Sequence, residues 1–131
     1  LSRSVTGAPP LSQRPVALME IARAEARLRS VRNFFYDDIH EAWESVIAGE
    51  DIQPEQINML RLSRTNAVRE AAQICRSMQL LMGMAGVSRT NAVARCVSDA
   101  LVITQHAFMG DVTYQNAGSI LCGQEPFPGY L

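Results

Sequence analysis

The chain has 131 residues, 47% of them hydrophobic, and a net charge of −1. It is long enough to bury a core, and it lacks the basic surface that nucleic acid or an anionic membrane requires. No apolar run approaches the roughly 20 residues that span a bilayer. The three cysteines, Cys75, Cys96 and Cys122, lie far apart, which is typical of a reduced cytoplasmic protein rather than of a disulfide framework or a metal site. We therefore expect one cytoplasmic domain over residues 1–131, without nucleic-acid, membrane or metal partners.

Residues 1–14 contain Gly, Pro and Ser without an apolar period, so they are predicted to form an extended lead-in. Because the chain begins at Leu1 rather than at Met, it is processed, excised or a fragment, and we expect a fragment. Pro15 suits the first turn of a helix. Helical spacing of apolar residues continues from there to about Ala48, and Gly49 ends it.

A second helix is predicted to begin at Pro54 and to end near Gly83. A third follows Asn91, a good N-cap residue, and carries apolar residues as far as Phe108 before Gly110 breaks it. A short fourth helix, with Asp111 as its cap, should close at Gly123, and the two prolines of the tail predict extended chain.

The first two helices should each be about 45–50 Å long at about 1.5 Å per residue. Long helices with short connections pack antiparallel, and aromatic residues make up only 6% of the chain, which favours helices over sheets. We predict an all-α protein, an up-and-down four-helix bundle. The broad apolar faces fit either a partner that covers them or a bundle that covers them itself, and the pattern leaves both open.

The third predicted helix carries an unusual polar stripe. At about 100° per residue, Arg95, Asp99, Val102 and His106 fall on one face. Arg95 and Asp99 are spaced for a structural i,i+4 ion pair. His106 lies about 10.5 Å along the helix axis from Asp99, too far to pair with it. Because imidazole titrates near neutral pH, His106 is the best candidate for chemistry, and the alternative is a histidine hydrogen-bonded within the bundle.

Metal and nucleotide motifs are not found in the sequence. A di-iron bundle needs two Glu-x-x-His motifs, and the nearest match is a single Asp37-x-x-His40. There is no P-loop, Gly-x-Ser-x-Gly or Cys-x-x-Cys sequence. We therefore expect no metal site.

The glycine turn GMAG at residues 83–86, Arg95, and the pair Ser98–Asp99 resemble the C-terminal helical domain of the acyl-CoA dehydrogenase superfamily. That domain has a Gly-Gly-x-Gly turn followed by a helix with an Arg and an Arg-Asp pair. The helix order matches over the whole chain, and the motif-level match covers residues 83–106. The family has Gly, Pro and Arg where this sequence has Met84, Ala92 and Ser98.

The dehydrogenases of this family continue to Tyr-Glu-Gly-Thr, whose Glu is the catalytic base. This chain instead reads QHAF at residues 105–108, without a carboxylate. In this it is similar to the hydroxylase branch, two-component flavin monooxygenases that act on phenols, steroids and related aromatic substrates. The resemblance implies that His106 is the catalytic residue, an acid/base or hydrogen-bonding group beside the reduced flavin.

The resemblance also implies that the turn at Gly83 and Gly86 approaches a flavin, FAD or FMN, and that Arg89 adds charge to this contact. A helical domain and a β-domain would precede the chain, so the fragment would hold an incomplete flavin site and be inactive alone. The partners implied are further copies in a homotetramer of the full-length protein, a separate flavin reductase and a small-molecule substrate.

Three functions therefore remain open for the chain. The first is the C-terminal domain of a flavin-dependent hydroxylase, and the second is the same domain of an acyl-CoA dehydrogenase whose base comes from another position. The third is a helical dimerisation or ligand-sensing domain without catalysis.

Overall fold

The computed structural model describes residues 7–131, and its regular elements are all helical. The α-helices are α1 (Pro15–Ile47), α2 (Pro54–Met82), α3 (Ala92–Thr104) and α4 (Asp111–Leu121). The predicted all-α class and its four helices are confirmed. Over residues 7–131 no helix combines the length and apolar character that crossing a membrane requires.

The expected lead-in is described only in part. Residues 1–6 lie outside the described residues, and residues 7–10 have no regular structure. Leu11–Gln13 form a 3₁₀ turn rather than extended chain. The prediction is therefore confirmed for residues 7–10 and wrong for Leu11–Gln13.

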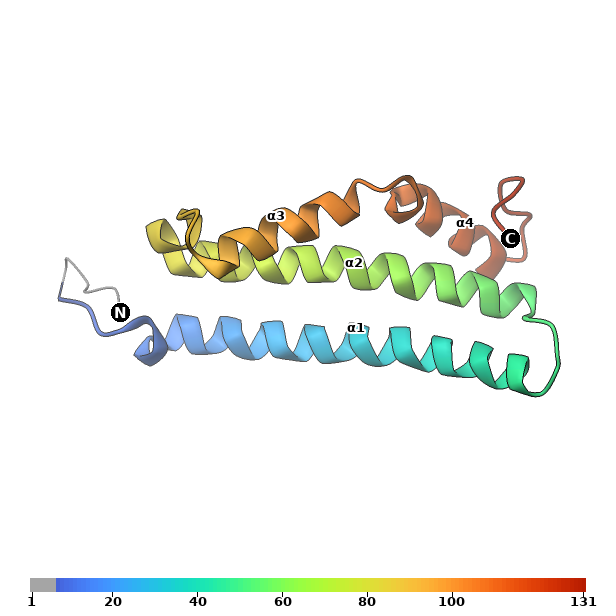
Figure 1. The fold of residues 1–131 in the computed structure, drawn as a ribbon, viewed down its shortest axis with the longest axis horizontal. Helices are drawn as coiled ribbons and strands as arrows, with labels where there is room; N and C mark the ends of the chain where they lie inside the picture. Colours follow the sequence, from blue (N-terminus) through green and yellow to red (C-terminus); the bar gives the residue numbers. More distant parts are fainter. Residues whose placement is uncertain (1–6) are drawn as a thin grey trace.

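Helix α2 lies at the centre of the molecule (Figure 1). Helix α1 runs antiparallel to it on one side, while α3 and α4 follow one another along the other side. The predicted antiparallel packing of the two long helices is thus observed. Since α3 and α4 share one side of α2, the helices form three layers rather than four columns around one core.

Local signals at the helix ends explain these boundaries. Pro15 and Pro54 occupy the first turns of α1 and α2, where a missing N–H has no cost. Asn91 caps α3, and its Oδ1 accepts a hydrogen bond of 2.9 Å from the backbone N–H of Val93. Gly49, after α1, has a φ of 76°, a conformation that glycine adopts without strain.

The end of the third helix was predicted wrongly. Helix α3 stops at Thr104, not beside Gly110. The Thr104 hydroxyl donates to the Leu101 carbonyl at 2.7 Å, and His106 N–H bonds the Ile103 carbonyl in a tighter i→i−3 turn. A 3₁₀ turn, Ala107–Met109, follows. The stripe of Arg95, Asp99 and Val102 therefore does not reach His106.

The start of the fourth helix also differs from the prediction. Gly110 is the N-cap of α4, and Asp111 is its first residue rather than its cap. An acidic side chain in the first turn still interacts favourably with the helix dipole. The helix closes at Leu121, and Gly123 follows with a φ of 70°.

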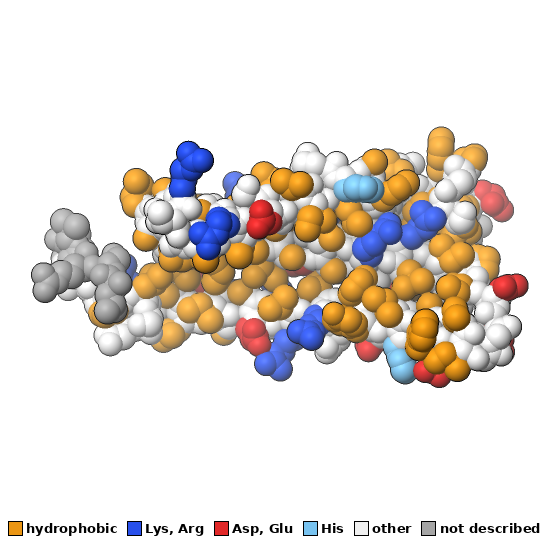
Figure 2. All heavy atoms as spheres, in the orientation of Figure 1, with side chains coloured by type: hydrophobic (Ala, Val, Ile, Leu, Met, Phe, Trp, Pro, Cys, Tyr) orange, Lys and Arg blue, Asp and Glu red, His pale blue; other side chains and the backbone are white. Residues whose placement is uncertain are grey.

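Few apolar side chains are buried in this arrangement. The buried apolar residues are Ala17, Val31, Ala42, Ala117 and Tyr130, and the buried polar ones are Asn58, Ser63, Thr65, Thr113 and Asn116. Large apolar side chains cover much of the face in Figure 2. The accessible surface is 9359 Å², against about 6,800 Å² expected for a folded monomer of 14.4 kDa. The helices thus leave apolar faces uncovered, as in a domain that packs against further protein.

Candidate functional site

The glycine turn is held rigidly between α2 and α3. Gly86 is buried, and a Cβ there would collide with the carbonyl oxygen of Gln79. The Gln79 side chain donates to the Gly86 carbonyl at 3.1 Å, and Asn91 Nδ2 donates to the Ala85 carbonyl at 2.9 Å. Gly83 ends α2 with a φ of 57°, which favours glycine. Two side-chain amides thus hold the turn, one from α2 and one from the N-cap of α3.

The outer edge of this turn is open. A Cβ at Gly83 would meet nothing within 4 Å, and the Arg89 side chain is exposed. Among residues 7–131, no hydrogen bond or ion pair engages the Arg89 guanidinium. Open backbone beside an unpaired guanidinium suits the approach of a phosphate. The turn therefore fits one edge of the flavin site that the resemblance implies.

His106 lies in the loop after α3, with its side chain exposed. Its Nδ1 accepts a hydrogen bond of 3.3 Å from the backbone N–H of Phe108, so a neutral imidazole carries its proton on Nε2. The His106 and Phe108 rings lie 5.5 Å apart between centroids. In the described part of the chain no hydrogen bond engages Nε2, so this nitrogen remains available to a bound molecule.

Helix α2 anchors the loop that carries His106. The buried Thr65 hydroxyl donates to the Phe108 carbonyl at 3.3 Å, and Arg69 Nε donates to the Met109 carbonyl at 3.0 Å. Arg69 also forms an ion pair of 3.0 Å with Asp111. The roles of Thr65 and Arg69 were not predicted from the sequence. Their i,i+4 spacing was visible, but their partner carbonyls become accessible only because α3 ends early.

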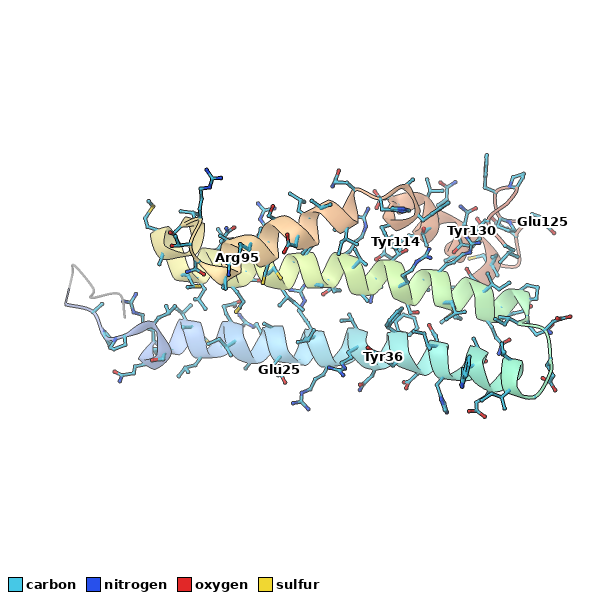
Figure 3. The ribbon with its side chains drawn as sticks, viewed as in Figure 1. Glu25, Tyr36, Arg95, Tyr114, Glu125 and Tyr130 are labelled. Atoms are coloured by element: carbon cyan, nitrogen blue, oxygen red, sulfur yellow. The ribbon has the colours of Figure 1, made fainter. Side chains whose placement is uncertain are left out.

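The predicted ion pair of Arg95 and Asp99 is not formed. Arg95 Nη1 donates instead to the Thr90 carbonyl at 3.4 Å, and the ion pairs within residues 7–131 include none between Arg95 and Asp99. Both side chains are exposed, and an exposed i,i+4 pair contributes only about 0.3–0.5 kcal/mol. A nearby loop carbonyl is therefore an adequate competitor. Figure 3 shows Arg95 near the glycine turn, far along α2 from Tyr114 and Tyr130.

The C-terminal tail packs against α2 through Tyr130. It contains no helix after Leu121, as predicted, and its Tyr130 is buried against α2. The Tyr130 hydroxyl donates to Asn58 Oδ1 of α2 at 3.2 Å. Burial raises the pKa of Tyr130, and the guanidinium groups of Arg61 and Arg64 partly oppose that rise. The tail thus lies beside both arginines.

Helix α3 separates the glycine turn from the His106 loop. Its 13 residues correspond to about 20 Å at about 1.5 Å per residue. The two predicted parts of the site therefore cannot touch the same aromatic ring. In residues 7–131 no three His, Cys, Asp or Glu side chains come together as a metal site.

Comparison with known proteins identifies the family. Residues 2–111 match the model of the acyl-CoA dehydrogenase C-terminal domain. The chain belongs to this family, a domain of oxidoreductases, as its glycine turn predicts.

Two relatives carry a more specific name. The chain is 57% identical over 128 residues to indole-3-acetate monooxygenase of Pseudomonas putida and 43% identical over 128 residues to indole-3-acetate monooxygenase of Acinetobacter baumannii. Each comparison covers 98% of this chain and 33% of the relative, so the chain spans about a third of the length of these curated relatives. Their names favour the predicted hydroxylase branch over the dehydrogenase branch.

Proposed function

We propose that this chain is the C-terminal domain of a flavin-dependent monooxygenase that acts on an aromatic carboxylate such as indole-3-acetate. The observation that carries the proposal is the 57% identity to an indole-3-acetate monooxygenase along 98% of the chain. The site supports it chemically, because His106 presents an exposed imidazole that a hydrogen bond orients, and the resemblance implies that this residue replaces the carboxylate base of the dehydrogenases.

The proposed cofactor is a flavin, which when bound supplies the activation of molecular oxygen. The residues that would contact it are Gly83, Gly86 and Arg89 at a phosphate and His106 at the ring. Since α3 holds these two groups about 20 Å apart, the turn and the His106 loop serve either the two ends of a dinucleotide or flavins of two protomers.

His106 is proposed to hold or move a proton. The Phe108 N–H fixes the ring through Nδ1 at 3.3 Å, so Nε2 is the atom that exchanges a proton with the bound molecule. An imidazole nitrogen can both accept and donate a proton, so the same atom serves both directions of transfer. The anchors from Thr65 and Arg69 keep the ring in place although it lies outside a helix.

We further propose that the full-length protein is a homotetramer supplied with reduced flavin by a separate reductase. The support for assembly is the apolar surface that the helices leave uncovered, including Trp43 with 58% of its surface exposed; the reductase is what the resemblance to the hydroxylase branch implies. A tetramer would bury such faces between copies.

Oxygen labelling of the full-length protein tests the proposed function. The protein is supplied with reduced flavin, ¹⁸O₂ and indole-3-acetate, and the products are analysed by mass spectrometry. We expect one ¹⁸O atom in an indole product. Hydrogen peroxide as the sole product with every aromatic substrate tested would contradict the proposal, and bleaching of the flavin by an acyl-CoA would support the dehydrogenase alternative.

A further inference from the structure

A cleft lies between α1, α2 and the His106 loop. Its volume is 410 Å³, within the usual size of small-molecule sites, and its lining residues are Phe35, Ile57, Leu60, Arg61, Arg64 and Phe108. A second cavity of 260 Å³ shares Phe35 and Arg64 with it and is otherwise lined by small and aliphatic side chains of α2 and α3. The two cavities therefore share an aromatic wall residue, Phe35, and a guanidinium-bearing one, Arg64.

Arg64 is the unusual member of this wall. Its Nε is buried, and no hydrogen bond to it is made by residues 7–131. Neither Arg64 nor Arg61 takes part in an ion pair within this described range. A buried charged donor without an acceptor is unfavourable, so an anion in the cleft would complete it.

Neighbouring groups do not satisfy this donor. Asp38 of α1 also has a buried oxygen, Oδ2, without a hydrogen-bond partner in the described chain, but it lines neither cavity and forms no ion pair with Arg64 there. Arg61 lies over the Tyr130 ring at 5.0 Å from its centroid, which keeps its head group at the edge of the cleft.

The cleft is continuous with the His106 loop. Phe108 lines it, and the Phe108 ring lies 5.5 Å from the His106 ring between centroids. A planar ring between Phe35 and Phe108 would contact two aromatic side chains. A carboxylate can accept two parallel N–H hydrogen bonds from a guanidinium. A molecule with both features would contact Phe108, whose ring is the neighbour of the imidazole.

We propose that Arg64, assisted by Arg61, binds the carboxylate of the aromatic substrate, and that Phe35 and Phe108 flank its ring. This inference rests on the monooxygenase function proposed above and assigns the substrate-orienting contact within it. The arginine at one end of the ring then fixes which part of the substrate faces His106.

Paired ligands and variants test the assignment. Binding of indole-3-acetate and of its neutral analogue indole-3-acetamide is measured by calorimetry on the full-length protein carrying Arg64→Gln, Arg64→Lys or Arg76→Gln. Arg76 is an exposed control on the same helix that lines neither cavity. We expect Arg64→Gln to raise the Kd for indole-3-acetate by about 10–100-fold and to leave indole-3-acetamide unchanged. The Kd of Arg64→Lys for indole-3-acetate should lie between those of the wild type and Arg64→Gln, and the Kd of Arg76→Gln should equal that of the wild type.

Other outcomes overturn the proposal. Equal weakening of both ligands would show that Arg64 only shapes the cleft, and unchanged indole-3-acetate binding would place the carboxylate elsewhere. Weaker flavin binding with intact indole-3-acetate binding would assign the guanidinium to a flavin phosphate. If Arg64→Gln does not fold, Arg64→Lys, which keeps charge and stem, must still raise the Kd selectively for the carboxylate.

The proposed function can fail separately. A wild-type protein that transfers ¹⁸O to neutral indoles but binds no aryl carboxylate would refute the Arg64 assignment and leave the monooxygenase proposal standing. Failure to label any aromatic substrate would refute the monooxygenase proposal itself.

Discussion

Replacing Gly86 with alanine tests how closely the glycine turn is packed on α2. A Cβ at Gly86 would collide with the Gln79 carbonyl oxygen, and it would lie 3.1 Å from Met82 Cβ and 3.2 Å from the Gln79 carbonyl carbon. The Gln79 atoms belong to the helix backbone and cannot rotate away. The turn must therefore move outward, which breaks the bond of 3.1 Å from the Gln79 side chain to the Gly86 carbonyl.

The expected cost has two parts. Overpacking of this kind costs about 1–3 kcal/mol, and the lost hydrogen bond adds about 1 kcal/mol. Gly86→Ala should thus lower the free energy of unfolding by about 2–4 kcal/mol. Urea denaturation followed by far-UV circular dichroism measures this change.

Two other glycines provide matched controls. Gly118 lies inside α4 with nothing within 4 Å of a Cβ, so Gly118→Ala should stabilise the chain by about 0.5–1 kcal/mol. Gly83 also has open space, but its φ of 57° and ψ of −137° lie in a region that residues other than glycine rarely adopt, so Gly83→Ala should cost about 1–3 kcal/mol through backbone strain alone. A cost of Gly86→Ala below about 1 kcal/mol would refute the close packing of the turn.

Three further outcomes are expected. In the full-length protein His106→Ala should lower the monooxygenation rate by about 10²–10⁴-fold. Because the side chain is exposed, the free energy of unfolding should change by less than about 0.5 kcal/mol. Normal turnover by the folded variant would remove His106 from the mechanism. Tyr130→Phe should cost about 1–3 kcal/mol, since it leaves Asn58 Oδ1 buried and unpaired. The pKa of Tyr130 is raised in the folded state, so its contribution to the free energy of unfolding is present below about pH 10 and is lost at higher pH. Tyr130→Phe should therefore flatten the alkaline decline of that free energy, measured by urea titrations at several pH values. Sedimentation should show a species larger than 14.4 kDa that Trp43→Glu dissociates, and a monomer at high concentration would contradict the proposed burial of the apolar faces.

The helix boundaries that the sequence predicts correctly all rest on local chemistry. Pro15, Pro54 and Asn91 act within one turn of their own positions. The end of α3 was missed because the apolar pattern continues to Phe108 without a breaker. Hydrogen bonds from Thr65 and Arg69, which are distant in sequence, hold the chain after Thr104 in another conformation. A periodic pattern contains no information about such partners.

The candidate site likewise has one part that a local motif predicts and one part that depends on residues distant in sequence. The glycine turn is recognisable from a short motif, and the structure adds the reason why Gly86 has no room for a side chain. The cleft at Arg61 and Arg64 was not predicted, because two arginines three residues apart on a helix look like a solvated face. Only the approach of Phe35 from α1 and Phe108 from the loop makes a recess of them.

The polar residues buried on α2 explain how a chain with few buried apolar side chains positions a site. Apolar contacts are non-directional and do not fix the orientation of an exposed loop. Hydrogen bonds do, and α2 directs them to two non-helical segments: Thr65 and Arg69 bond the His106 loop, and Asn58 bonds Tyr130 of the tail. The buried Thr65 and Asn58 would be unfavourable without these partners, so the loop and the tail must dock on α2 together. Helix α2 is therefore the element whose register determines where His106 and the Arg64 cleft lie relative to each other.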